Sequence, residues 1–187
     1  MKKYFVAGDK LLAFNAKCCT TSLCREIIRT YYPEIESTIQ SAHYPEGVTV
    51  ETARHHMWIP QRINADRPVV VLLRDPVERF RSAMHETGLL DADAVLAGLA
   101  SESGNYGRGP VGRLLAANIH FLPQTRFSGE VTYYTNPDDA AAALGLAVPL
   151  PMLNESGEKP TLTSSQEQAV REWYAEDQAL WDSLVSG

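Results

Sequence analysis

Short apolar runs separated by polar or glycine-containing breaks predict a chain in which strands and helices alternate. Residues 4–6 and 11–14 are apolar and flank Gly8-Asp9, a pattern that is typical of a β-hairpin. Residues 69–73 form an unbroken aliphatic run, as expected of a central parallel strand that is buried on both faces. Residues 131–134 are expected to form another strand.

Segments of helical length follow most of these strands. Helices are predicted at residues 21–32, after Asp75, at 92–100, 111–119 and 138–144, and as one long closing helix at 164–184. Residues 34–66 predict short helices and loops, and residues 101–110 and 149–160 predict irregular segments. This order favours an α/β fold: a single small domain, residues 1–187, with a mainly parallel central sheet flanked by helices.

The segment between the second apolar run and the next helix carries candidate phosphate-binding residues. Its sequence is Asn15-Ala16-Lys17-Cys18-Cys19-Thr20-Thr21-Ser22, so a lysine and three hydroxyl groups stand where the helix is predicted to begin. Backbone N–H groups and the positive end of the helix dipole favour an anion at such a position. The segment therefore predicts a P-loop-like phosphate-binding turn. In the alternative interpretation, Thr20 is only an N-cap and Lys17 is only a solvated loop lysine.

The segment after the central strand carries a second candidate. Arg74 stands at the carboxyl end of that strand, where open α/β sheets bind their ligands. Asp75 is a predicted N-cap, Pro76 the first helical residue, and Glu78 follows the cap by three residues. Arg74 can offer a planar donor fork to a phosphate, while Ser82, two turns into the helix, adds a hydroxyl. In the alternative interpretation, Arg74 pairs with Asp75 or Glu78 and Ser82 is an ordinary surface serine.

These segments resemble the two nucleotide-binding motifs of the sulfotransferases that use 3′-phosphoadenosine 5′-phosphosulfate (PAPS). Lys17-Cys18-Cys19-Thr20-Thr21-Ser22 is similar to the family's 5′-phosphosulfate loop, and the segment from Arg74 to Ser82 is similar to its 3′-phosphate motif. Two later patches resemble the carbohydrate sulfotransferase branch: His120-Phe121-Leu122-Pro123-Gln124, and the tail from Leu153-Asn154 through Tyr174-Ala175-Glu176-Asp177. The resemblance implies a sulfotransferase that takes PAPS as its nucleotide and needs no metal.

The resemblance also implies a set of nucleotide-binding residues. They are Lys17, Cys18, Cys19, Thr20, Thr21 and Ser22 at the 5′ end, with Arg74 and Ser82 on the 3′-phosphate. Lys17 would also be catalytic, because it could hold the bridging oxygen of the departing 5′-phosphate. The family usually carries Gly where this chain has Cys19, and a Cβ hinders the torsion or the close approach that Gly allows. Either the loop avoids that torsion, or the nucleotide binds less tightly.

Transfer to a hydroxyl requires a general base, and the family places a His or Glu before the central strand. The candidates are His43, Glu51, His55 and His56. Histidine titrates near neutral pH, and we favour His56, then His55, because both lie beside the hydrophobic Met57-Trp58. Adjacent helical residues point about 100° apart, so at most one of the pair faces the site.

Composition limits the partners. A chain of 187 residues with 44% hydrophobic residues fits a compact enzyme, and a formal net charge of −6 argues against a nucleic-acid binder. Cys18, Cys19 and Cys24 are expected to be reduced, because three clustered cysteines form no disulfide framework, and no second Cys/His pair has zinc-ligand spacing. No apolar run approaches the ~20 residues of a membrane span, and no signal peptide is recognised at the amino end. We expect a cytoplasmic monomer or homodimer acting on a small-molecule or carbohydrate acceptor, without membrane or nucleic-acid partners.

Two other functions stay open. The first is a noncatalytic module that binds PAPS or its desulfated product, 3′-phosphoadenosine 5′-phosphate (PAP). The second is a nucleotide or small-molecule kinase, which is disfavoured because the chain contains no Gly-x-x-x-x-Gly-Lys-Ser/Thr string. The sequence does not identify the acceptor.

Overall fold

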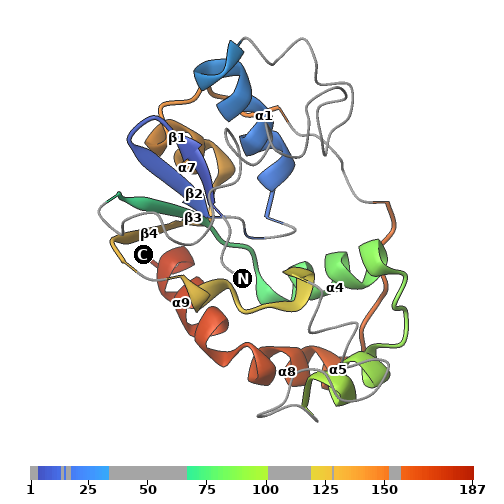
Figure 1. Ribbon diagram of the computed structural model, residues 1–187. Coiled ribbons are helices and arrows are strands. Elements are labelled where there is room, and N and C mark those ends of the chain that lie inside the picture. The colour runs from blue at the N-terminus through green and yellow to red at the C-terminus, as the bar shows by residue number, and fades with distance from the viewer. Residues whose placement is uncertain are drawn as a thin grey trace. The chain divides into compact units, whose positions relative to one another are not determined.

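The protein consists of two compact units, each with its own core (Figure 1). A computed structural model describes residues 4–13, 15, 18–33, 67–100, 119–127, 129–151 and 157–187. The sheet unit takes its residues from Met1–Leu73 and Arg126–Glu155, and the helical unit takes its residues from Arg74–Thr125 and Ser156–Gly187.

The sheet unit is built on four strands: β1 (Tyr4–Ala7), β2 (Lys10–Ala13), β3 (Val69–Leu72) and β4 (Val131–Tyr134). Their order in the sheet is β1-β2-β3-β4. β1 pairs antiparallel with β2, while β2 with β3 and β3 with β4 pair in parallel. The predicted hairpin is confirmed, and so are the central strand and the mainly parallel sheet. β2 and β3 therefore end at the same edge of the sheet.

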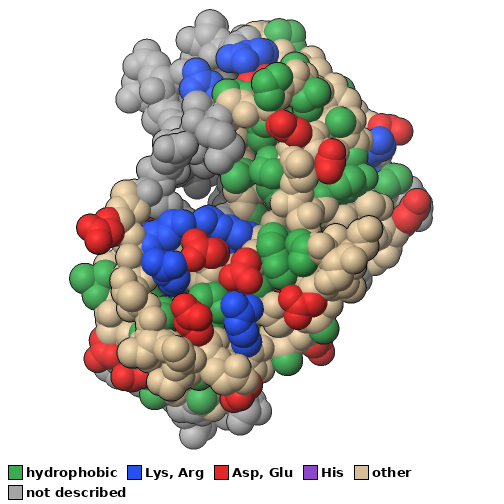
Figure 2. All heavy atoms as spheres, turned by 180° about the vertical axis from the view of Figure 1, so that it is seen from behind, with side chains coloured by type: hydrophobic (Ala, Val, Ile, Leu, Met, Phe, Trp, Pro, Cys, Tyr) green, Lys and Arg blue, Asp and Glu red, His purple; other side chains and the backbone are tan. Residues whose placement is uncertain are grey.

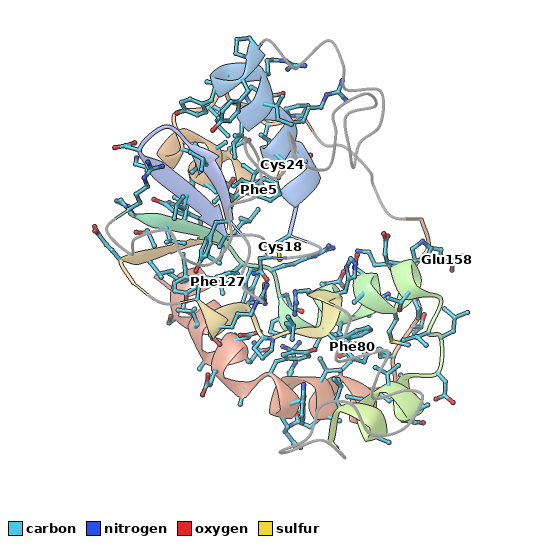
Figure 3. The ribbon with its side chains drawn as sticks, in the orientation of Figure 1. Phe5, Cys18, Cys24, Phe80, Phe127 and Glu158 are labelled. Carbon is cyan, nitrogen blue, oxygen red and sulfur yellow. The ribbon has the colours of Figure 1, made fainter. Side chains whose placement is uncertain are left out.

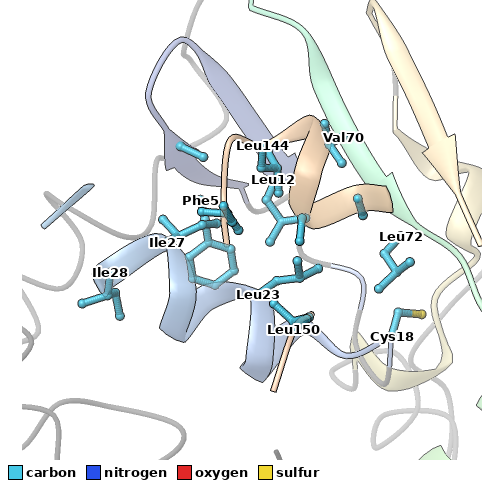
Figure 4. Close-up of a cluster of buried hydrophobic side chains, with 14 residues drawn as sticks. Phe5, Leu12, Cys18, Leu23, Ile27, Ile28, Val70, Leu72, Leu144 and Leu150 are labelled. Carbon is cyan, nitrogen blue, oxygen red and sulfur yellow. The ribbon is translucent and has the colours of Figure 1, made fainter. Parts of the chain in front are cut away.

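Two helices, α1 (Thr20–Tyr31) and α7 (Pro137–Ala143), pack against this sheet. The register places Phe5, Leu12 and Val70 side by side on one face, because Phe5 pairs with Leu12 and Leu12 with Val70. Figure 4 shows these three side chains in one cluster with residues of α1 and with the end of α7. The helical members of the cluster are Leu23, Ile27, Ile28, Ala140, Ala141 and Leu144. Both helices therefore cover the same face, and this packing fixes the beginning of α1.

The described residues of the helical unit form four α-helices and the 3₁₀ turn η1, and a second 3₁₀ turn, η2, begins in this unit. The α-helices are α4 (Pro76–Thr87), α5 (Ala92–Ala100), α8 (Ser164–Trp173) and α9 (Ala175–Val185), and the turns are η1 (Ile119–Phe121) and η2 (Gln124–Arg126). Their core is a second cluster: Val77, Phe80, Ala83, Met84, Ala92, Val95, Leu99, Phe121, Leu162, Val170 and Tyr174. Within it the rings of Phe80 and Phe121 meet edge to face, with centroids 5.7 Å apart.

The predicted single helix at residues 164–184 is wrong, because the structure has two helices that meet at Tyr174. Tyr174 leaves the helical conformation with φ −103° and ψ 39°. Its buried hydroxyl donates a hydrogen bond to the Phe121 carbonyl oxygen at 2.7 Å, and the buried Asp177 carboxylate accepts from Gln124. The break lets both side chains reach the same segment, and these tertiary contacts outweigh the local preference for a continuous helix.

The other predicted elements that fall on described residues are present. The helix at 92–100 and the strand at 131–134 have the predicted bounds, α1 begins at Thr20, and α7 begins at Pro137. Predicted elements within 34–66 and 101–118 lie outside the described residues. The described part of the chain thus forms an α/β protein with a mostly parallel four-stranded sheet and six α-helices. None of these helices combines the length and the apolar character needed to cross a membrane.

Candidate functional site

The first junction, residues 15–19 between β2 and α1, ends in a left-handed residue. Cys19 has φ 52° and ψ 21°, and it is the only residue other than glycine with a positive φ in the described ranges. This conformation costs a residue with a Cβ about 1–2 kcal/mol. Cys19 is also the N-cap of α1, without a side-chain capping bond, so the alternative in which Thr20 is the N-cap is wrong. The loop does not avoid the left-handed torsion that glycine would adopt readily.

The start of α1 carries no acidic side chain. No Asp or Glu lies in its first turn, so the positive end of the helix dipole keeps its effect there. Cys18 and Ser22 are buried beside this helix start. Lys17 lies outside the described residues, as do the side chains of Thr20 and Thr21.

Asn15 joins the ends of two neighbouring strands. Its side chain is 1% exposed, and its Nδ2 donates to the Leu72 carbonyl oxygen at the end of β3 across 3.0 Å. Its Oδ1 accepts from Arg126 Nη1 at 3.4 Å. Sequence reasoning assigned Asn15 no role, although a polar residue directly after a buried strand is a signal for such a bond.

The second junction, residues 73–75 between β3 and α4, has the capping that the sequence predicts. The Asp75 Oδ1 accepts from the Glu78 backbone N–H at 2.9 Å, and Pro76 is the first helical residue. The main chain of Arg74 is bound on both sides by one side chain: its N–H donates to Gln124 Oε1 at 3.0 Å, and its carbonyl accepts from Gln124 Nε2 at 2.8 Å. This junction is therefore held by the protein's own contacts.

The guanidinium of Arg74 shares the Glu78 carboxylate with two other cations. Arg74 Nη2 lies 3.7 Å from Glu78 Oε2, whereas Arg81 Nη1 and Lys159 Nζ lie 2.6 and 3.2 Å from the Glu78 oxygens. Partial burial by itself raises the pKa of Glu78, but the hydrogen bonds and charges of Lys159 and Arg81 outweigh it, so this pKa lies below its ordinary value. The predicted alternative pairing with Glu78 is present but long. Three cationic side chains therefore lie within 3.7 Å of one carboxylate.

Neighbouring charges of opposite sign are a feature of the surface. Figure 2 shows Lys and Arg side chains next to Asp and Glu side chains on one face of the molecule. Asp75, the other acid that the alternative assigned to Arg74, has its Oδ2 3.5 Å from Arg171 Nη1. Ser82 lies in α4 and is completely buried, so it is not an ordinary surface serine.

Two sequence patches noted for their resemblance meet inside the helical unit. The Asp177 carboxylate is 1% exposed and accepts bonds from the backbone N–H groups of Gln124 and Thr125 and from the Thr125 hydroxyl. The guanidinium of Arg79, also buried, donates to the Leu122 carbonyl at 2.6 Å and lies over the Tyr174 ring. Gln124 and Asp177 were not predicted as site residues, because their contacts join segments 50 or more positions apart.

The remaining candidates fall in two groups. The four candidate bases, His43, Glu51, His55 and His56, lie outside the described residues. None of the three cysteines forms a disulfide, and Figure 3 labels two of them, Cys18 and Cys24. Burial raises the pKa of the Cys24 thiol well above its ordinary value. Across the described ranges, no three His, Cys, Asp or Glu side chains gather as a metal site would require.

Comparison with known proteins adds no relative to this picture. No protein-family model matches the chain, and no match was found among the curated proteins or the solved structures. The interpretation of the site therefore rests on the chemistry of the two junctions.

Proposed function

We propose that the protein is a PAPS-dependent sulfotransferase that transfers a sulfuryl group to a hydroxyl or an amine of a small-molecule or carbohydrate acceptor. The observation that carries the proposal is the hydrogen bond from Asn15 Nδ2 to the Leu72 carbonyl oxygen. It joins the ends of β2 and β3, the two parallel strands from which the two motif-bearing segments continue. Ligands of open α/β sheets bind beyond the carboxyl ends of such strands.

The first junction suits the 5′-phosphosulfate end of the nucleotide. The start of α1 has no acidic residue, so its backbone N–H groups and dipole favour an anion. Lys17 would hold the bridging oxygen, while the backbone N–H groups of Cys18 to Ser22 would surround the 5′-phosphate. Direct binding by the side chains of Cys18 and Ser22 would require their exposure, as for Ser82. The left-handed Cys19 fits this assignment, because strained backbone conformations cluster at ligand-binding sites.

The second junction suits the 3′-phosphate. Arg74 is one of three cationic side chains around the Glu78 carboxylate, and its planar fork can bind a phosphate through two parallel bonds. α4 already carries Asp75 and Glu78 at its start, so its N-terminus is the poorer anion site and the guanidinium is the better one. Direct binding by Ser82 would require exposure of its buried hydroxyl.

The proposed reaction is a single in-line displacement. A bond forms between the acceptor oxygen or nitrogen and sulfur, and the bond between sulfur and the bridging oxygen breaks. The acceptor proton goes to a base, for which His56 and then His55 are the candidates. Lys17 stabilises the negative charge that develops on the departing 5′-phosphate, so positioning and charge stabilisation supply most of the catalysis.

A noncatalytic PAPS- or PAP-binding module is the second candidate. The observation that favours it is Cys19, because the loop carries a Cβ at a left-handed position where the resembling family has Gly. A nucleotide or small-molecule kinase is the weaker candidate, because an Arg-to-Ser 3′-phosphate motif has no role in binding a nucleoside triphosphate.

Binding of PAP, compared with adenosine 5′-phosphate (AMP), tests the nucleotide assignment. We expect calorimetry to give tighter binding of PAP, because AMP lacks the 3′-phosphate. Arg74→Ala should remove that preference and the thermal shift that PAP produces, whereas Arg67→Ala, at an exposed arginine before β3, should leave both unchanged. A wild-type protein that does not bind PAP would exclude both the enzyme and the module.

A transfer assay separates the enzyme from the module. Acceptors are screened with labelled PAPS, and sulfated product is measured for the wild type and for His55→Ala and His56→Ala. An enzyme that uses one of these bases loses transfer in one variant and keeps PAP binding. Binding without transfer to any acceptor would favour the module.

A further inference from the structure

The side chain of Gln124 binds both peptide groups of a single residue, Arg74. Its Oε1 accepts from the Arg74 N–H at 3.0 Å, and its Nε2 donates to the Arg74 carbonyl oxygen at 2.8 Å. A primary amide is the uncharged side-chain group that offers a donor and an acceptor in the geometry of a peptide. Gln124 therefore acts on Arg74 as a residue of a neighbouring strand would, through a hydrogen-bonded pair.

The position of Arg74 gives this contact its importance. Arg74 lies beyond β3 (Val69–Leu72), whose ladder with β4 continues to the bond from Leu73 N–H to the Tyr134 carbonyl at 2.7 Å. The next residue along the chain is bonded by Gln124 instead. The Arg74 main chain is therefore fixed at the point where the strand becomes a helix.

Gln124 is itself held by a buried carboxylate. Its backbone N–H donates to both Asp177 oxygens, at 2.9 and 2.7 Å, and the neighbouring Thr125 donates to Asp177 through its N–H and its hydroxyl. Gln124 is 0% exposed and Asp177 is 1% exposed. These hydrogen bonds fix the position of the Asp177 carboxylate. The carboxylate in turn fixes the backbone of Gln124, from which the side-chain amide extends.

We propose that Gln124 is a positioning residue that sets the place of the Arg74 guanidinium and so the preference for a 3′-phosphorylated nucleotide. This inference rests on the proposed function, which assigns the 3′-phosphate to Arg74. A guanidinium binds a phosphate through two parallel bonds only in a narrow range of orientations. A shift of the Arg74 backbone by about 1 Å would therefore remove most of the energy of the second hydrogen bond between the guanidinium and the phosphate.

The test measures the ratio of PAP affinity to AMP affinity by calorimetry. In Gln124→Met, which keeps the side-chain length and removes both bonds to Arg74, this ratio should fall about tenfold, with AMP affinity unchanged. Gln124→Glu keeps the acceptor for the Arg74 N–H but places a carboxylate oxygen against its carbonyl, so the ratio should fall as well. Gln168→Met, at an exposed glutamine of α8, is the matched control and should keep the wild-type ratio.

The double variant with Arg74→Ala completes the cycle. If Gln124 acts through Arg74, adding Gln124→Met to Arg74→Ala causes no further loss of the ratio. Equal loss of PAP and AMP affinity, or an unchanged ratio, shows a purely structural role and overturns the inference alone. If Gln124→Met does not fold, Gln124→Glu decides by the same ratio. A wild type without preference for PAP overturns the proposed function, and the inference with it.

Discussion

The two strand-to-helix junctions differ in how the helix after each parallel strand begins. At the second junction, Asp75 caps α4, Pro76 begins it, and Gln124 binds the main chain of Arg74 on both sides. At the first junction, α1 begins after the left-handed Cys19, without a side-chain capping bond and without an acidic residue in its first turn. Both junctions have hydrogen bonds of their own, but only the first includes a left-handed residue with a Cβ and a helix start without an acidic residue.

This difference indicates where a ligand contributes most to stability. An anion at the first junction would oppose the positive end of the α1 dipole, because the first turn of α1 holds no acidic residue. An anion at the second junction would instead meet a main chain that is already fixed, and it would gain chiefly from Arg74. We therefore expect an anion to interact chiefly with the start of α1 at the first junction and with the Arg74 guanidinium at the second.

The largest effect is expected from removal of the carboxylate that supports the second junction. Asp177→Ala leaves the buried N–H group of Gln124 and the partly buried N–H group of Thr125 without their acceptor, and each such loss costs about 1–3 kcal/mol. The free energy of unfolding, measured with a chemical denaturant, should fall by about 3 kcal/mol or more. Glu176→Ala, at the exposed neighbour in α9, should change it little. Equal effects of the two substitutions would show that Asp177 does not hold this junction.

A smaller loss is expected from removal of the cap itself. Asp75→Ala deletes the acceptor of the Glu78 N–H, and loss of an N-cap costs about 0.5–2 kcal/mol. Arg171→Ala removes the ion pair between Arg171 and Asp75, and the hydrogen bond from Arg171 to Gln178, but keeps the cap. A larger loss in Asp75→Ala than in Arg171→Ala is therefore due to the capping bond. If the denaturation midpoints of the two variants agree, the stability of α4 does not depend on its cap. Capping would then not distinguish the second junction from the first.

Local signals predicted the second junction, because they lie within a few neighbouring residues. The order of Asp75, Pro76 and Glu78 is sufficient to place the start of α4, and the aliphatic run at 69–73 is sufficient to place the central strand. The left-handed Cys19 was not predictable in the same way. Cysteine has no preference for that conformation, so no local signal in the sequence points to it.

Long-range contacts account for what sequence reasoning missed. No glycine or proline marks the break at Tyr174, which depends on the bond from its hydroxyl to Phe121 and on the burial of Asp177. The pairing of Gln124 with Arg74 joins residues 50 positions apart, and local periodicity carries no information on such a pair. Apart from the break at Tyr174, the local pattern therefore predicts the helices and strands of the described residues, whereas it does not predict the contacts that fix the candidate site.

At the first junction a gain in stability is expected. Cys19→Gly removes the Cβ from a left-handed residue, and after the entropy cost of glycine the free energy of unfolding should rise by about 0.5–1 kcal/mol. Cys19→Ala keeps a Cβ and is the matched control, with no gain expected. If the glycine variant is no more stable than the alanine variant, the backbone of Cys19 is not strained. The two junctions would then not differ in backbone strain.

The smallest effect is expected at Glu78, whose carboxylate has no counterpart in the first turn of α1. Partial burial alone raises its pKa, but Lys159 and Arg81 lower it overall, so the ionised form stabilises the folded protein. This contribution is present above the unfolded pKa and is lost as pH falls through the lower folded value. For an exposed group, Glu78→Gln should cost about 0.5 kcal/mol at pH 7, and the difference from the wild type should close as pH falls below about 4.5. Added salt at pH 7 should narrow the same difference by screening. If the difference in the free energy of unfolding between the wild type and Glu78→Gln persists at low pH, Glu78 acts through packing. The charge of Glu78 would then not stabilise the second junction.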